Sequence, residues 1–296
     1  MKLNTAIIKS LGDLETSAVT NYLIGVVIFR LYQSKEYKGE AISKITNNAP
    51  TLKVVTSKIN ELIEDGILNK LESGIYSLIG RSHPDSTAVA CAVDPFCYVS
   101  HLSAMEFHGL TERIPSKLHL SSPTQKLWND YAISKMQKDL GEGYATYLEE
   151  KLPNLTKRMP HKIGKSEIHL INTKQTHSGA FKNIQDRSIR VSTIGRTFLE
   201  MIKKPELCGG IKHVISVYEE HAKTYLRLIV SEIDRHGAAI DKIRTGYILD
   251  ELMQVENATV ESWTTLRRRG GSMKLDMNAE YHHEFSEKWW ISLNLF

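Results

Sequence analysis

The chain has 296 residues, of which 41% are hydrophobic and 24% charged, and its formal net charge is +4. This length accommodates two domains, and the composition is typical of a globular protein and excludes wholesale disorder. The longest relevant apolar run, residues 22–29, is too short to span a bilayer, and the N-terminus lacks the features of a signal peptide. We therefore expect a cytoplasmic protein without a membrane partner.

Three cysteines, Cys91, Cys97 and Cys208, are spaced irregularly along the chain. Their spacing fits no metal-ligand motif, and an odd number of them suits a reducing compartment. We expect each to be a small buried side chain, with no metal and no cofactor bound to the protein.

The first part of the chain predicts the order helix, helix, helix, hairpin. Thr16 or Ser17 could cap a helix that ends near Gln33, and a short helix is expected over residues 40–45. Residues 46–50 are polar and end in proline, which favours a turn.

Residues 51–65 give the clearest helical pattern of the chain. Apolar side chains recur at spacings of three and four, and Gly66 follows in a position typical of a helix C-terminus. Two β-rich runs, residues 67–71 and 75–79, then flank a glycine-containing loop and predict a hairpin. The whole order predicts a winged helix-turn-helix domain over residues 1–82.

A polar stretch around Pro84 marks the expected domain boundary, and residues 86–296 predict a larger mixed α+β domain. The overall fold class is therefore α+β. Helices are expected over residues 100–108, 127–138, 194–203, 209–221, 224–236 and 239–255. Strands are expected over residues 116–120, 168–172, 188–191, 272–275 and 288–295.

The helix over residues 51–65 has the two faces that a DNA-reading helix needs. An apolar back holds such a helix in place, while a polar front enters the major groove, where base edges carry a distinguishable pattern. Five lysines against two glutamates give residues 35–60 a net charge of +3, which suits the phosphate backbone. The candidate DNA contacts are Lys38, Lys44, Thr51, Lys53, Ser57, Lys58, Asn60, Lys70 and Ser73. The competing interpretation is a three-helix folding unit or a protein-docking module.

Positive charge also gathers in the second predicted domain. Residues 151–190 hold nine basic side chains against two acidic ones. A second cluster could contact DNA or another anionic partner and comprises Arg267, Arg268, Arg269 and Lys274. The alternative is a solvated face whose charges are scattered in three dimensions.

No constellation in the sequence predicts catalysis. His101 and His108 are seven residues apart, whereas a zinc-protease helix needs two histidines four apart flanking a glutamate. The Gly209–Gly210 pair lacks the Gly-Lys-Ser/Thr of a phosphate-binding loop and is expected to begin a helix. We therefore expect a protein that is not an enzyme and has no catalytic residues.

A series of short segments resembles the AbiEi antitoxins of type IV toxin–antitoxin systems, which act in abortive infection and phage defence. The segments keep the order of the family across nearly the whole chain, although Gly195 precedes Arg196 where the family more often has an acidic residue. They are residues 74–78, 98–104, 108–111, 191–200, 205–210, 244–249, 274–276 and 290–294.

This resemblance implies an antitoxin that represses its own transcription by binding inverted repeats in double-stranded promoter DNA. It also implies that the second domain counteracts a cognate nucleotidyltransferase toxin, with no stable complex required. Two alternatives remain open. One is a winged-helix regulator whose second domain senses a ligand or partner, and the other is a nucleic-acid-processing enzyme with a winged-helix targeting domain.

Overall fold

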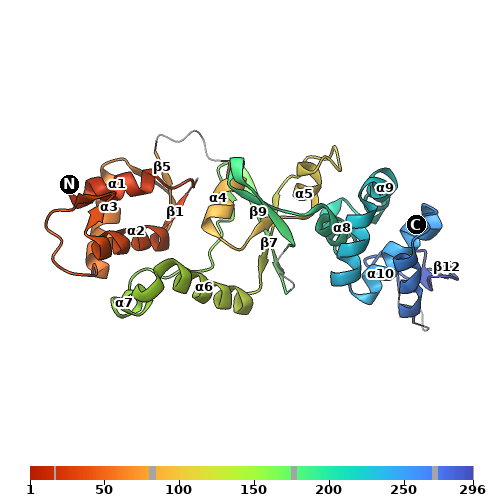
Figure 1. Ribbon diagram of the computed structural model, residues 1–296. Helices are drawn as coiled ribbons and strands as arrows, with labels where there is room; N and C mark the ends of the chain where they lie inside the picture. Colours follow the sequence, from red (N-terminus) through yellow and green to blue (C-terminus); the bar gives the residue numbers. More distant parts are fainter. Residues whose placement is uncertain (17, 80–84, 175–178, 269–272, 296) are drawn as a thin grey trace. The chain divides into compact units, whose positions relative to one another are not determined.

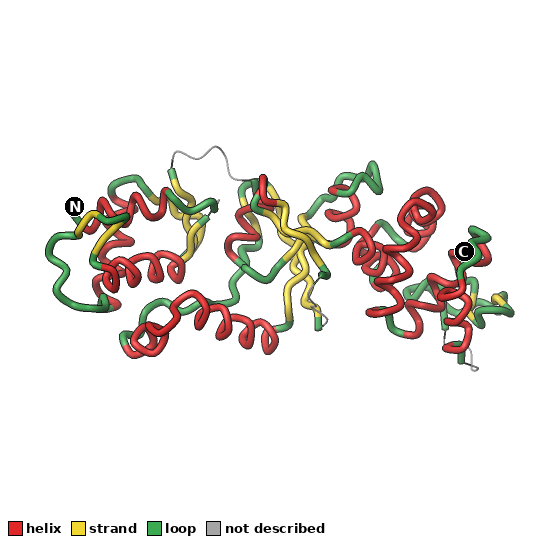
Figure 2. The backbone as a smooth tube through the Cα atoms, in the orientation of Figure 1, coloured by secondary structure: helices red, strands yellow, loops and turns green. Residues whose placement is uncertain are grey.

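The computed structural model describes residues 1–16, 18–79, 85–174, 179–268 and 273–295. The fold is mixed α+β, with helices in red and strands in yellow in Figure 2. Two compact units make up the chain: the first is Met1–Tyr98, Ser121–Thr176 and Asn183–Arg190, and the second is Val99–Leu120, His177–Lys182 and Val191–Phe296. The boundary expected near Pro84 falls within residues 80–84, which lie outside the described part.

The first unit begins with three helices and a small sheet (Figure 1). Strand β5 lies between β1 and β4 and is antiparallel to both, with Val19 opposite Tyr76 and Leu68 opposite Leu78. The elements, in order, are α1 (Leu3–Gly12), β1 (Val19–Thr20), α2 (Asn21–Ser34), β2 (Glu36–Tyr37), β3 (Glu40–Ala41), α3 (Leu52–Glu64), β4 (Leu68–Glu72) and β5 (Ile75–Leu78).

The prediction of a helix over residues 40–45 is wrong. Strands β2 and β3 form a tight hairpin instead, and Lys38 and Gly39 at its turn have φ angles of 48° and 85°. Two successive residues with positive φ are typical of a two-residue hairpin turn. Ile42 is buried in the core and Ile45 packs against it. The three-residue spacing of these two side chains therefore reflects contact with the core and not a helix.

The predicted cap of α2 is also misplaced. Thr20, and not Thr16, caps the helix, because its hydroxyl accepts a hydrogen bond from the Leu23 N–H at 3.3 Å. Thr16 donates its hydroxyl proton to the Ala18 carbonyl. The other expected cap, Ser17, lies outside the described residues.

The core of the first unit joins α1, α2 and α3 to two later helices, α6 (Gln125–Leu140) and α7 (Tyr144–Glu149). The Tyr147 ring packs edge-on against Phe29 with centroids 5.3 Å apart. Gly25 permits this approach, because a Cβ there would lie 2.6 Å from the Tyr147 hydroxyl oxygen. The Tyr22 hydroxyl donates to Asp139 at 2.8 Å, which adds a polar tie between α2 and α6.

A six-stranded mixed sheet has the order β10-β11-β6-β7-β9-β8. Strand β11 is parallel to β6, whereas β8 and β9 form an antiparallel pair. Three strands expected from the sequence are confirmed as β7, β9 and β11. The strands are β6 (Tyr98–Val99), β7 (Leu118–Pro123), β8 (Lys162–Ile163), β9 (Ser166–Thr173), β10 (Phe181–Ile184) and β11 (Ile189–Ser192), and two helices, α4 (Ser86–Val93) and α5 (His101–Phe107), flank β6 in the sequence.

Helices dominate the second unit. The helix expected over residues 194–203 is confirmed as α8, and the two expected over 209–221 and 224–236 are one continuous helix, α9, because no breaker separates them. Gly210 caps α9, as expected. The elements are α8 (Ile194–Lys203), α9 (Ile211–His236), α10 (Ala239–Gly246), the π-helix η4 (Tyr247–Leu252), α11 (Ala258–Ser262), β12 (Phe285–Ser286) and β13 (Ile291–Ser292), and the 3-10 turns are η1 (Gly141–Gly143), η2 (Gln185–Arg187), η3 (Pro205–Cys208) and η5 (Trp263–Leu266).

The strand expected over residues 272–275 forms only an isolated bridge, between Lys274 and Ser292, and residue 272 lies outside the described part. Of the strand expected over residues 288–295, only β13 forms.

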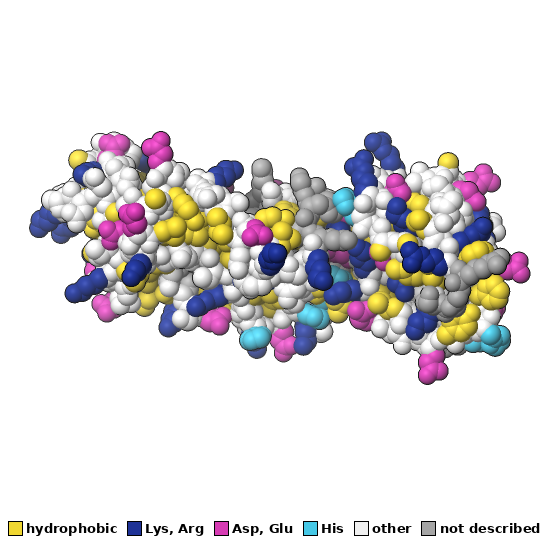
Figure 3. Space-filling view, turned by 90° about the horizontal axis from the view of Figure 1, so that it is seen from below, with side chains coloured by type: hydrophobic (Ala, Val, Ile, Leu, Met, Phe, Trp, Pro, Cys, Tyr) yellow, Lys and Arg dark blue, Asp and Glu magenta, His cyan; other side chains and the backbone are white. Residues whose placement is uncertain are grey.

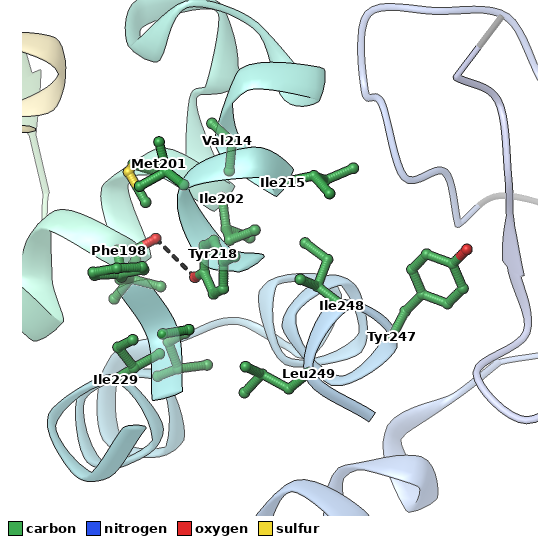
Figure 4. Close-up of a cluster of buried hydrophobic side chains, with 14 of the residues drawn as sticks. Phe198, Met201, Ile202, Val214, Ile215, Tyr218, Ile229, Tyr247, Ile248 and Leu249 are labelled. Atoms are coloured by element: carbon green, nitrogen blue, oxygen red, sulfur yellow. Dashed lines mark hydrogen bonds between the residues drawn. The ribbon is translucent and has the colours of Figure 1, made fainter. Parts of the chain in front are cut away.

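The core of the second unit is the cluster of side chains between α8, α9, α10 and η4 shown in Figure 4. The Phe198 and Tyr218 rings meet edge to face with centroids 4.8 Å apart. The buried Tyr218 hydroxyl donates to the Phe198 carbonyl at 3.1 Å, so its polar atom is satisfied. Trp263 and Trp289 are also buried in this core.

The longest helix, α9, has 26 residues and carries charged side chains along its length. Across the described residues, the structure contains no helix that combines the length and the apolar character needed to cross a membrane.

Candidate nucleic-acid interface

Helix α3 presents one polar and one buried face. Its N-cap is Thr51, whose hydroxyl accepts from the Val54 N–H, and Val55, Ile59 and Leu62 are buried beneath it. The opposite side exposes Lys53, Ser57 and Asn60, which the sequence analysis had selected. Lys53 and Asn60 can donate hydrogen bonds to base edges or to phosphate oxygens, whereas the Ser57 hydroxyl already donates to Glu61.

Lys58 differs from the other selected residues of α3. Its ammonium lies 2.7 Å from the Glu61 carboxylate, and Ser57 donates to the same carboxylate at 3.1 Å. Hydrogen bonds from Lys58 and then from Asn4 hold the pKa of Glu61 below its ordinary value. Lys58 is only 23% exposed, so its charge is already partly neutralised within the protein.

Two further side chains of α3, Thr56 and Leu52, are exposed beside the predicted contacts. Thr56 is exposed and lies three residues after Lys53 and four before Asn60, on the same face of the helix. Leu52, the first of the apolar side chains that recur at spacings of three and four, is 44% exposed and does not share their burial. The helical spacing from Lys53 would have identified Thr56, whereas nothing local distinguishes Leu52 from the buried Val55.

The hairpin of β4 and β5 places Lys70 and Ser73 on the surface, with Ser73 at the turn. Gly74 follows with a φ of 76°, a conformation that favours glycine. Its carbonyl accepts from the Asn21 N–H, which ties the turn to the start of α2. This hairpin therefore offers an exposed cation and a hydroxyl on a strand pair that a short connection joins to α3.

Lys38 and Lys44 lie in the segment between α2 and α3. The Lys38 ammonium pairs with Asp13 at 2.8 Å and lies over the Tyr37 ring. This pairing raises the pKa of Lys38 and lowers the pKa of Asp13. The hydrogen bond between the two side chains is the largest cause of both shifts. Lys44 is exposed and has a φ of 69°, so its backbone is held in the left-handed region.

The second basic cluster is only partly available to a partner. Arg267 stacks over the Trp290 ring at 4.7 Å and donates to the Lys288 carbonyl, while Lys274 donates to the Ala279 carbonyl at 2.7 Å. Arg268 is exposed, and Arg269 lies outside the described residues. Figure 3 shows one face of the molecule, where dark-blue basic side chains alternate with magenta acidic ones.

Two basic residues of the 151–190 stretch serve the fold of the first unit. The Arg190 guanidinium donates at 2.6 Å to the carbonyls of Cys91, Asp94 and Cys97. Lys157 donates to the Pro123 carbonyl and to the Asn172 side chain. The charge of this stretch seen in the sequence therefore overstates the charge that it presents to a partner.

The cysteines are buried, as expected, but two of them are not merely apolar. The Cys91 thiol accepts a hydrogen bond from the Arg190 backbone N–H at 3.4 Å. A hydrogen bond with Cys97 and the positive charge of Arg190 lower the pKa of Cys91 to about 7. Burial of the thiol acts in the opposite direction and raises this pKa.

His101 and His108 have separate structural partners. His101 Nδ1 lies 2.9 Å from the Ser100 hydroxyl, whereas His108 donates to the Ser192 carbonyl at 2.7 Å. In the described part of the chain, no three His, Cys, Asp or Glu side chains converge as metal ligands.

Comparison with known proteins finds similarity among solved structures. No protein-family model matches the chain, and no curated protein matches it. Among solved structures, the RV2827C protein from Mycobacterium tuberculosis is similar over 98% of this chain and 90% of its own, with a TM-score of 0.53 and 11% sequence identity. At this identity the similarity concerns the fold alone.

Proposed function

We propose that residues 1–79 form a winged helix-turn-helix that binds double-stranded DNA. Helices α1, α2 and α3, with the sheet order β1-β5-β4, match the element order of that domain. In this assignment α3 enters the major groove and the β4–β5 hairpin is the wing on the adjacent backbone. The connection between α2 and α3 is longer than the sequence analysis expected, because it contains the β2–β3 hairpin.

The observation that carries this proposal is the exposed polar face of α3. Lys53, Thr56 and Asn60 recur at helical spacing on a helix whose other face is buried, so the helix is held rigidly while these side chains stay exposed. The Thr56 hydroxyl donates to the Leu52 carbonyl at 3.0 Å and can still accept a hydrogen bond. Asn60 can recognise adenine with two hydrogen bonds, and Lys53 can reach guanine or phosphate.

We also propose that the protein acts as an antitoxin that represses its own operon and counteracts a nucleotidyltransferase toxin. The ordered series of AbiEi-like segments supports this assignment. In the structure, two of these segments, residues 191–200 and 205–210, form α8 with the end of β11 and the turn before α9. They therefore lie at the core of the second unit, where the proposal places toxin neutralisation.

DNA binding is tested by fluorescence anisotropy of the full chain on its own upstream DNA and on a scrambled duplex at several salt concentrations. Lys53→Ala should reduce the slope of log K against log salt by about 0.9, the contribution of one phosphate contact. Asn60→Ala should lower affinity for the upstream DNA more than for the scrambled duplex. Lys212→Ala, an equal charge change at an exposed position of α9, is the matched control. Equal binding of both duplexes by the unmodified protein would refute sequence-specific repression.

Antitoxin activity is tested by co-expression with the adjacent gene when that gene encodes a nucleotidyltransferase. The full chain should restore growth, and so should a Lys53→Glu/Thr56→Glu variant that no longer binds DNA. Rescue by the unmodified chain alone would assign neutralisation to repression at the promoter, and rescue by neither would contradict the antitoxin proposal.

A further inference from the structure

A groove of about 610 Å³ lies along the C-terminal half of α9 and is closed on one side by residues around the start of α11. All of its lining residues belong to the second unit. Its volume falls in the range of small-molecule sites in proteins. None of the candidate DNA contacts lines this groove.

Two basic side chains lie together at one end of the groove, and Arg235 lines the other end. Lys223 and Arg227 are both exposed, and four residues separate them, which places them one above the other on the same face of α9. Within the described part of the chain, neither forms an ion pair with a carboxylate. The Thr224 hydroxyl lies beside them in the lining. Such a pair of cations suits a phosphate chain, to which arginine donates two parallel hydrogen bonds.

The other end of the groove carries hydrogen-bond acceptors and donors. Asp234 accepts from Trp263 Nε1 at 2.9 Å and from Lys242 Nζ at 3.0 Å, and both bonds end on Oδ1. These bonds lower the pKa of Asp234, so it is ionised at neutral pH with Oδ2 available as an acceptor. Asn257 uses its Oδ1 as a helix cap, which leaves its amide N–H groups as donors.

Between the two ends the lining contains two apolar side chains and the Ser231 hydroxyl. Leu226 is half-buried and Val230 is buried, and both line the groove. Seven residues of helix separate Arg227 from Asp234, or about 10 Å along the axis. The groove therefore offers, in order along α9, two cations, an apolar floor beside Ser231, and a carboxylate flanked by Arg235 and the Asn257 amide.

From this order we propose that the groove binds a nucleoside triphosphate. The phosphates lie against Lys223 and Arg227, the sugar and base cover Leu226 and Val230, and Asp234 accepts from ribose hydroxyls or a base amine. The proposal is independent of DNA binding by α3.

The test is isothermal titration calorimetry of the full chain with ATP and GTP, and with adenosine, inorganic tripolyphosphate and a single-stranded hexanucleotide as comparison ligands. We expect saturable binding of ATP or GTP with a dissociation constant of millimolar or tighter. Lys223→Ala/Arg227→Ala should weaken it about tenfold or more, since two charge-assisted contacts are lost. Lys212→Ala, on the same helix but outside the groove, should leave it unchanged.

Circular dichroism of each variant is the check on folding. We expect every variant to fold, because Lys223, Arg227 and Lys212 are all exposed. Ser231→Ala, a second lining change that keeps the charge, should weaken binding less than the double variant. Absence of ATP and GTP binding at millimolar concentration, or equal binding by the double variant, would overturn the proposal. It would also be overturned if tripolyphosphate or the hexanucleotide bound as tightly as the nucleotides.

Discussion

The Lys58 ammonium lies 2.7 Å from the Glu61 carboxylate, one helical turn further along α3. The same carboxylate also accepts from Ser57 and from Asn4, which is 57 residues away in the chain. Two of the candidate DNA contacts are therefore engaged by one acidic residue of the same helix. Any phosphate that approaches Lys58 must compete with this carboxylate.

Replacing Glu61 with glutamine should strengthen DNA binding. Glutamine keeps an acceptor for Asn4 and removes the charge that neutralises Lys58, so the salt dependence should steepen by about 0.9 in slope. Stability should fall by no more than about 1 kcal/mol, because the pair is partly exposed. Anisotropy titrations at several salt concentrations measure the effect. Glu219→Gln, at an exposed position of α9, controls for the change in net charge. An equal gain in DNA affinity in both variants would contradict the role given to Lys58.

The buried pair of Arg196 and Glu200 should be a major determinant of stability. Arg196 Nε lies 3.3 Å from Glu200 Oε1, the two side chains are 4% and 5% exposed, and Glu200 also accepts from the His101 N–H. Arg196→Met should lower the free energy of unfolding by roughly 3 kcal/mol, because it leaves a buried charge unpaired.

The double variant Arg196→Met/Glu200→Gln should be less destabilised than the sum of its two single variants, because the Glu200 charge is then removed together with its partner. Glu232, whose carboxylate lies 3.6 Å from Arg196 Nη1, loses this partner equally in the single and double variants that lack Arg196. Urea unfolding of all four proteins gives the coupling energy. Strict additivity would show that the two side chains do not stabilise each other.

Gly195 is required by the close approach of α8 to α9. A Cβ at this position would lie 2.5 Å from the Leu228 carbonyl oxygen and 3.0 Å from the Glu232 Cβ. Gly195→Ala should therefore destabilise the protein by about 1–3 kcal/mol through overpacking. Thermal and urea unfolding measure the change. Gly12→Ala, where no atom lies within 4 Å of the added Cβ, should be neutral or slightly stabilising.

His108 should make stability fall as the pH is lowered. Burial, partly opposed by its hydrogen bond to Ser192, lowers the pKa of His108 below its ordinary value. The unfolded chain therefore binds a proton on His108 more readily than the folded protein does. The contribution of neutral His108 to the free energy of unfolding is complete above about pH 6.5 and is lost as the pH falls through the folded-state pKa.

His108→Gln keeps a donor for the Ser192 carbonyl and cannot titrate. Its stability should decline less than that of the unmodified protein between pH 7.5 and pH 5, as measured by urea unfolding at each pH. The exposed His283→Gln serves as the control. A parallel decline in the unmodified protein and in His108→Gln would assign the pH dependence to other groups.

The sequence by itself determined the local elements that have strong periodicity and clear ends. Helix α3 lies within one residue of its predicted start and end, because Thr51 caps it and apolar residues recur at helical spacing. Helix α8 was predicted with its exact bounds for similar reasons, since Thr193 caps it and Pro205 follows its end. These signals act over a few residues and can be read without knowledge of the rest of the fold.

Only the tertiary structure decided which charges remain available to a partner. Asn4 reaches Glu61 and Arg190 reaches the Cys91 carbonyl across long intervals of sequence, and both contacts remove polar groups from the exposed surface. The groove along α9 likewise depends on Asn257 and Thr259, which follow α9 only after α10 and η4. Periodicity records which face of a helix is buried, but the partner of a polar side chain is set by segments that meet only on folding.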